Sequence, residues 1–110
     1  RLESTAKAML DGLAVWVREV RRPNDEQSPT IIDHELRRAE RLSSFFNDLT
    51  SNPVFSEKIN LAQLYLFAAL DLERRIPDFQ WRTSNIQLSK WFDQFNLRKS
   101  VKASLAPQSV

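Results

Sequence analysis

The sequence has no cysteine, one histidine and one glycine among its 110 residues. Without cysteine there is no disulfide framework, no thiolate nucleophile and no cysteine zinc site. A single histidine excludes multi-histidine metal sites and the HExxH protease motif, so we expect no metal site. A single glycine excludes the glycine-rich loops that hold phosphate groups in P-loop and dinucleotide-binding proteins. It also disfavours a many-turned sandwich or barrel, which leaves an all-α fold.

Long apolar runs are also missing. No stretch reaches the roughly 20 apolar residues that a bilayer-spanning helix needs, and the N-terminus lacks a signal-peptide pattern. We therefore expect no membrane partner, and the lack of cysteine suits a reducing, cytoplasmic location. The length and the 42% hydrophobic content predict a single domain over residues 1–110.

The net charge of +2 is unevenly distributed along the chain. From residue 82 onward, five basic residues stand against one acidic residue, for a net +4, which leaves −2 for the first 81 residues. A basic end can contact nucleic acid or a membrane surface. The aromatic and basic residues do not alternate as in known nucleic-acid modules, so we expect a solvated end and no nucleic-acid partner.

Apolar residues at spacings of three and four predict a first helix from Arg1 to Val20. Its core stripe is Leu2, Ala6, Met9, Leu13, Trp16 and Val20. Leu10, Ala14 and Val17 widen this stripe on one side, where we expect an apolar surface that the core does not use. The pattern begins at the first residues, without an initiator Met or a capping residue, which predicts a fragment of a longer chain.

A second helix is predicted after Ser28, a plausible N-cap, with Pro29 at its first position. It is expected to end near Thr50, and its buried stripe is Ile32, Leu36, Ala39, Leu42, Phe46 and Leu49. His34 lies near its start. We expect a surface histidine there, because no nucleophile with an orienting acid accompanies it.

The third predicted helix, from Leu61 to Leu72, is apolar nearly all the way round, so we expect it to be central and covered on every side. Asn60 is a preferred N-cap. Gln63 at the third position can reach back to the N–H of the cap, as in a capping box. Ile59 and Leu64 form the matching hydrophobic staple.

A fourth helix is predicted after an ordered turn over residues 77–81. Asn85 is its expected cap, and its apolar side is Ile86, Leu88, Trp91, Phe92 and Phe95. A separate short last helix is expected from Ser100 to Leu105, packed through Val101, with residues 106–110 frayed.

Taken together, these segments resemble the all-helical C-terminal domain of cytosolic glutathione transferases, particularly the bacterial kind. The likeness covers essentially the whole chain in the same order and spacing. In that family a Ser or Thr cap and an Asp form the capping box, where this sequence has Asn and Gln. Lys99 stands where proline is common in the family. The segments that carry the likeness are 1–11, Ser28-Pro29, Ile59–Leu64, Leu70–Arg82 and Leu88–Ser100.

The resemblance implies an all-α bundle of four main helices plus a short last helix, with a buried central helix. It also implies an N-terminal thioredoxin-like domain, absent from this chain, that holds glutathione and supplies the Tyr, Ser or Cys that activates its thiol. Glutathione would be the co-substrate of this presumed parent, and this domain alone would bind no cofactor. Tyr65, the one tyrosine, lies in the helix expected to be buried and does not replace the missing residue.

In such enzymes the helical domain lines the site for the hydrophobic co-substrate. The matching positions are Leu10, Asp11, Ala14 and Leu72, where ordinary packing or inter-domain contact is an equal alternative. The leading hypothesis is therefore the second domain of a cytoplasmic, homodimeric glutathione transferase, inactive by itself. One alternative is a non-catalytic transferase-like module for protein assembly. Another is an independent helical protein that shares only the fold.

Overall fold

The computed structural model describes the backbone of residues 1–104 and the side chains of residues 1–98. It contains four α-helices: α1 (Leu2–Val20), α2 (Pro29–Asn47), α3 (Leu61–Asp71) and α4 (Ile86–Ser104). Three short 3-10 turns separate them, η1 (Asn24–Glu26), η2 (Pro53–Phe55) and η3 (Leu72–Arg74). The described residues contain no strand, so the predicted all-α bundle of four helices is confirmed.

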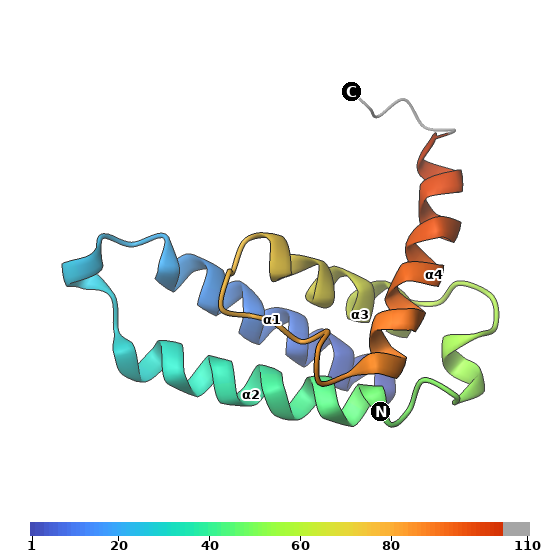
Figure 1. Cartoon of the computed structure of the whole chain (residues 1–110), viewed down its shortest axis with the longest axis horizontal. Coiled ribbons are helices and arrows are strands. Elements are labelled where there is room, and N and C mark those ends of the chain that lie inside the picture. The colour runs from blue at the N-terminus through green and yellow to red at the C-terminus, as the bar shows by residue number, and fades with distance from the viewer. Residues whose placement is uncertain (105–110) are drawn as a thin grey trace.

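The helices α1, α2 and α3 lie side by side, with α1 in the middle (Figure 1). Helix α2 returns antiparallel to α1, and α3 runs in the same direction as α1. The segment between η3 and α4 crosses the front of the bundle, and α4 then rises steeply across the end of the three helices. The core lies between these layers, and the predicted stripe of α1 supplies four of its most buried side chains: Ala6, Met9, Leu13 and Trp16.

The turn between α1 and α2 is ordered by polar side chains rather than by apolar contacts. Glu19 is 5% exposed, and its Oε2 accepts the backbone N–H of Ser28 at 2.6 Å. Ser28 in turn caps α2, because its Oγ accepts the N–H of Ile31 at 3.2 Å. Gln27 Nε2 donates to the carbonyl of Arg22 at 2.9 Å. Backbone N–H groups at the start of α2 and a backbone carbonyl just after α1 therefore have side-chain hydrogen-bond partners in this turn.

Close approach of α1 and α2 depends on the one glycine. A Cβ at Gly12 would lie 2.8 Å from Glu35 Oε1 and 3.0 Å from Arg38 Nη1. Glu35 is buried, and Arg38 Nη2 donates to the carbonyl of Ala8 at 3.3 Å across the helix pair. The missing side chain makes room for a polar contact between the two helices.

Helix α2 ends at Asn47, earlier than the predicted Thr50. The last turn tightens, because the N–H of Leu49 bonds to the carbonyl of Phe46 at 3.0 Å. The side chain of Asn47, the last residue of α2, bonds to another helix. Its Oδ1 accepts the N–H of Leu88 in the first turn of α4 at 2.8 Å. Asn85, the predicted side-chain cap of α4, instead donates from Nδ2 to the carbonyl of Trp81 at 2.7 Å.

The predicted short last helix is wrong, because α4 continues without a break to Ser104. A proline at position 99 would remove an N–H from the helix, whereas Lys99 keeps it. The helical part of the expected segment is thus the end of α4. The packing expected for Val101 and the end of that segment at Leu105 lie outside the described side chains and residues, as do residues 106–110.

Aromatic rings form one continuous chain of contacts through the core. Consecutive ring centroids lie 4.6 to 5.9 Å apart, which is the range of favourable ring pairs. The chain links α2, η2, α4, α3 and the segment before α4. In order, its rings are Phe45, Phe46, Phe55, Trp91, Phe95, Phe67, Phe92 and Trp81.

Candidate functional site

The candidate residues on α1 divide between core and surface. Leu10 and Ala14 are half-buried and stand four residues apart on one side of the helix. Asp11 is exposed and pairs with Lys7 at 3.3 Å. Val17, expected on the same open side, is only 8% exposed and belongs to the core cluster, so that expectation is wrong. Of the three residues expected on this side of α1, Leu10 and Ala14 therefore remain available as apolar surface.

Helix α3 is buried on one side only, which corrects the expectation that it is covered all round. Its inward side carries Ala62, Leu66 and Ala69, all at most 4% exposed. On the outward side Leu61 is 49% exposed. The other outward residues are half-buried: Leu64, Tyr65, Ala68 and, at the start of η3, Leu72.

Because α1 and α3 pack side by side, their outward apolar residues belong to neighbouring helices. We call this surface the α1–α3 face; it consists of Leu10, Ala14, Leu61, Leu64, Tyr65, Ala68 and Leu72. Three of the four predicted contact residues lie on it. Tyr65 and its neighbours were missed because an all-round apolar helix was interpreted as a fully buried one. The spacing of 61, 65, 68 and 72 is the signal that marks one helical side.

The start of α3 is held by two amide side chains. Asn60 occupies the N-cap, and its Oδ1 accepts the N–H of Gln63 at 2.9 Å. Gln63 is fully buried, but it does not make the expected reciprocal bond to the N–H of Asn60. Its Nε2 donates instead to the carbonyls of Val54 at 2.8 Å and Glu57 at 3.2 Å. Asn60 Nδ2 donates to the same Val54 carbonyl at 2.9 Å.

This cluster has a structural role. The two amides join α3 to the preceding segment that contains η2, and no nucleophile or paired acid and base accompanies them. Ile59 and Leu64, the predicted staple, are both half-buried and packed against the core cluster. The sequence pattern identified the right residues, but Gln63 donates from Nε2 to loop carbonyls instead of accepting the N–H of Asn60.

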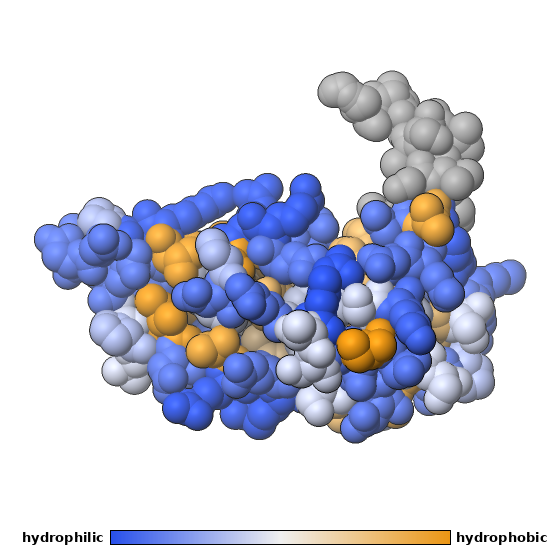
Figure 2. Space-filling model, in the orientation of Figure 1, coloured by the Kyte–Doolittle hydropathy of each residue, from blue (hydrophilic) through white to orange (hydrophobic). Residues whose placement is uncertain are grey.

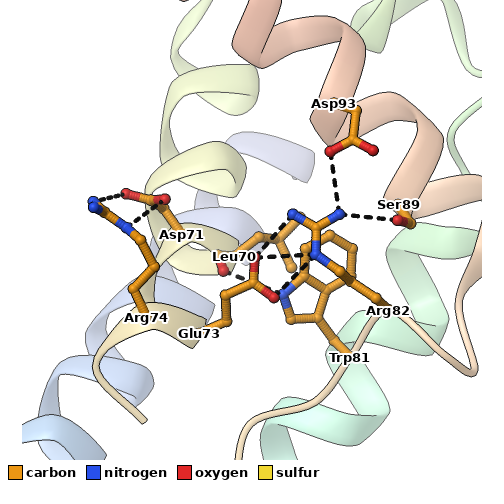
Figure 3. A network of polar contacts seen from close by, with 8 residues as sticks. All are labelled: Leu70, Asp71, Glu73, Arg74, Trp81, Arg82, Ser89 and Asp93. Atoms are coloured by element: carbon orange, nitrogen blue, oxygen red, sulfur yellow. Dashed lines mark hydrogen bonds and ion pairs between the residues drawn. The ribbon is translucent and has the colours of Figure 1, made fainter. Parts of the chain in front are cut away.

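A second polar cluster centres on Arg82 and connects three parts of the chain (Figure 3). Its guanidinium donates to both oxygens of Glu73 in η3, at 2.9 to 3.1 Å. It also donates to Ser89 Oγ at 3.0 Å and Asp93 Oδ1 at 3.2 Å, both on α4. The guanidinium carbon lies 4.7 Å from the ring centroid of Trp81. The predicted basic end is therefore partly neutralised at its first residue.

The neighbouring acidic side chains keep Arg82 in its charged form. Burial lowers the pKa of Arg82, but hydrogen bonds and charge attraction from Glu73 and Asp93 outweigh it, so the pKa of Arg82 is raised. A raised folded-state pKa gives stabilisation that is present below the unfolded pKa and lost only as the pH rises through the folded pKa. For an arginine that loss lies in strongly alkaline solution, so Arg82 acts as a permanent structural cation.

The remaining groups considered in the sequence, the single histidine and possible metal ligands, form no site among the described residues. His34 is exposed on α2. Among the described residues, no three histidine or acidic side chains are grouped as metal ligands would be. None of the described helices has the length and apolar content that a bilayer crossing requires. The α1–α3 face is thus the feature of the fold that corresponds to the predicted contact site.

Comparison of the chain with models of protein families, with curated proteins and with solved structures finds no match in any of the three. The functional assignment therefore depends on the residues and on the geometry of the fold.

Proposed function

We propose that this chain is the helical second domain of a glutathione transferase and that its α1–α3 face meets a thioredoxin-like domain. The observation that carries the proposal is that the rest of the bundle buries one apolar side of α3 only in part. A helix as apolar as α3 is expected to be covered, and an uncovered apolar side marks an interface.

The order of the helices supports the same proposal. The first helix, α1, carries an apolar stripe that is widened on one side. The second helix, α2, begins at a proline, and the third, α3, is apolar and has a side-chain N-cap. This order is the one on which the resemblance depends. The cap of Asn60 and the buried amide of Gln63 fix the start of α3 against the segment that contains η2. Its outward residues are therefore presented on a rigid element, as a contact surface requires.

In the parent protein the two domains would share the chemistry. The first domain would hold glutathione and lower the pKa of its thiol, and the thiolate would attack an electrophile. Leu10, Ala14 and Leu72 would supply the apolar side against which that electrophile is held, with Asp11 at the exposed edge. Holding both reactants together would supply the proximity that accelerates the reaction. The parent would be a cytoplasmic homodimer, and this domain alone would be inactive.

The test compares the isolated chain with the product of its whole gene. We expect the coding sequence before Arg1 to specify a thioredoxin-like domain with a Tyr, Ser or Cys near its first strand. The whole product should conjugate glutathione to an aryl halide, whereas the 110-residue chain should show no conjugating activity. In a calorimetric titration with millimolar glutathione, the 110-residue chain should show no saturable heat of binding. Leu72→Glu in the whole product should raise the KM for the aryl halide more than that for glutathione, while the exposed-site control Gln87→Glu changes neither.

Other outcomes favour the alternatives. An upstream domain without a thiol-activating residue, and without conjugating activity, indicates a protein-assembly module. A start codon directly before Arg1 indicates an independent helical protein. Tight glutathione binding by the isolated chain would contradict the division of labour between the two domains.

A further inference from the structure

On both helices of the α1–α3 face, the residue that follows the apolar stripe is an arginine. On α1, Arg18 stands four residues after Ala14, so it lies one turn further along the same side of the helix. In η3, which follows α3, the N–H of Arg75 bonds to the carbonyl of Leu72 at 2.9 Å. Side chains three residues apart in a 3-10 turn stand on the same side, so Arg75 directly follows Leu72 on the face. Both arginines are exposed.

The packing of α1 against α3 brings these two arginines to the same end of the face. Leu2, Thr5 and Ala62 line one cavity, which places the start of α3 beside the first turn of α1. The two helices run in the same direction (Figure 1). Because both helices rise by about 1.5 Å per residue, Leu72, ten residues after Ala62, lies close to the level of Ala14. The arginine that follows each stripe therefore lies at the C-terminal end of its helix, beside the other.

The carboxylates of α1 near this end have other partners. Asp11 pairs with Lys7 at 3.3 Å. Glu19 is buried, and its Oε2 accepts the N–H of Ser28 at 2.6 Å in the turn before α2. The other oxygen of Glu19 lies 3.7 Å from Arg22. Neither carboxylate pairs with an arginine of the face.

The carboxylates at the end of α3 and beyond it are also paired or border another helix. Asp71 pairs with Arg74 at 2.6 Å. Glu73 pairs with Arg82 at 2.9 Å (Figure 3). Asp78 lies on the segment that crosses the mostly hydrophilic front of the bundle, where it lines a cavity with residues of α2 (Figure 2). The positive charge at this end of the α1–α3 face is therefore not neutralised by these acids.

Arg18 and Arg75 are free cations at the edge of an apolar surface. Within the part of the chain that the structure describes, neither guanidinium makes an ion pair or donates a hydrogen bond. Arg21, the C-cap of α1, is a third exposed arginine at this end. Guanidinium groups bind carboxylates through charge-assisted hydrogen bonds. This end of the face therefore suits an anionic group that is attached to an apolar body.

We propose that the α1–α3 face selects an electrophile that carries an anionic group, such as an aryl halide with a ring carboxylate. The inference rests on the proposed transferase function and adds the charge of the co-substrate to it. The ring lies against Ala14 and Leu72, and Arg18 and Arg75 bind the carboxylate beyond them. The thiolate of glutathione attacks the ring carbon that bears the halogen, so that a carbon–sulfur bond forms, the carbon–halogen bond breaks and halide leaves with its electron pair. The arginines take no part in this bond exchange.

The test gives the whole gene product two substrates with the same ring and leaving group, anionic 4-chloro-3-nitrobenzoate and neutral 4-chloro-3-nitrobenzamide. The measured quantity is the ratio of kcat/KM for the benzoate to kcat/KM for the benzamide. Because the intrinsic reactivities of the substrates are constant, a change of this ratio between variants reports binding of the charge. Arg18→Gln and Arg75→Gln should each lower the ratio about threefold, as for the loss of one exposed charge pair.

Three controls separate recognition of the charge from other effects. Arg18→Lys keeps the charge and should keep most of the ratio. Arg41→Gln removes an exposed arginine of α2 and should leave the ratio unchanged. Added salt should lower the ratio of the parent more than that of the double variant, because salt screens exposed charges.

The outcomes distinguish this inference from the proposed function. A basic residue near a helix end also offsets the helix dipole, but that role affects stability and not the preference between two substrates. Equal losses of kcat/KM for both substrates in the Arg18 and Arg75 variants, or the same fall of the ratio in Arg41→Gln, would overturn the inference and leave the proposed function in place. Failure of the whole product to conjugate glutathione to either substrate would overturn both.

Discussion

Asn47 Oδ1 accepts the backbone N–H of Leu88, 41 residues further along the chain, at 2.8 Å. The last residue of α2 thereby supplies the side-chain acceptor for the first turn of α4. An N-cap usually comes from the residue just before its own helix. Here the cap is a tertiary contact, so the capping of α4 and the docking of α2 are one interaction.

Asn47→Ala should lower the free energy of unfolding by about 1 to 2 kcal/mol, because it leaves the N–H of Leu88 without its acceptor. Asn47→Asp should remain close to the parent, since a carboxylate accepts the same bond and suits the positive end of the helix. Urea unfolding of the two variants measures the difference. Asn96→Ala, at an exposed position of α4, serves as the control. Equal stability of Asn47→Ala and the parent would show that this contact contributes nothing.

Gln63→Ala should destabilise the domain more than Asn60→Ala. Loss of the Asn60 cap should cost about 1 to 2 kcal/mol. Gln63 is fully buried and donates to two carbonyls, so its removal leaves a cavity and takes away the side-chain donor of the Glu57 carbonyl, and should cost about 3 kcal/mol. Denaturant midpoints test the order, with exposed Gln87→Ala as a control. The reverse order would mean that the bonds to Val54 and Glu57 are not formed in solution.

Local spacing along the chain predicts which residues begin α3, but not which atoms their side chains contact. The identities of Asn60 and Gln63 follow from local spacing, because a cap and its helix are neighbours in the chain. The partners of Gln63 and the acceptor role of Asn47 depend on where separate segments meet. Periodicity carries no information about such meetings, and only the packed fold shows them.

The α1–α3 face could likewise be predicted from the sequence only in part. The outward position of Leu10 and Ala14 follows from the stripe of α1, whereas the burial of Val17 does not, because it depends on how other elements pack against α1. In α3 itself, apolar residues on every side hide which side is inward. The polarity contrast that orients α1 and α2 is missing there. The continuity of α4 as far as Ser104 was not predicted for a different reason, since apolar spacing alone does not distinguish one continuous helix from two.

Leu10→Lys and Val17→Lys should behave differently, although both change the same side of α1. Leu10 is half-buried, so a lysine there can reach solvent, and the loss of stability should be about 1 kcal/mol. Val17 is in the core, and a lysine there should cost about 3 kcal/mol or more. Urea unfolding measures these losses.

Binding of a hydrophobic dye gives the second readout for this pair. The α1–α3 face should bind the dye in the folded parent, and Leu10→Lys should reduce that binding. Unchanged dye binding by the folded Leu10→Lys variant would place the apolar surface elsewhere on the molecule.

Arg82→Gln should destabilise the domain by about 1 to 2 kcal/mol, because it removes charged hydrogen bonds to Glu73 and Asp93 and the contact with Trp81. Arg74→Gln is the matched control. Among the residues that the structure describes, Arg74 pairs only with Asp71, at an exposed site, so its loss should stay within about 0.5 kcal/mol. Urea midpoints at low and high salt measure both. A fall of the same size for the two variants would reduce Arg82 to an ordinary surface cation.

The ring contacts that run from Phe45 to Trp81 bear on how the domain comes apart. Helix α4 contributes three of these rings, and they touch η2, α3 and the segment before α4. Detaching α4 therefore breaks contacts in several other elements at once. A partly melted state with α4 free would expose the buried rings of Trp91, Phe92 and Phe95 together with their partners on η2 and α3, so the described elements should lose their structure in a single cooperative transition. Tryptophan emission and helical circular dichroism should then report the same midpoint.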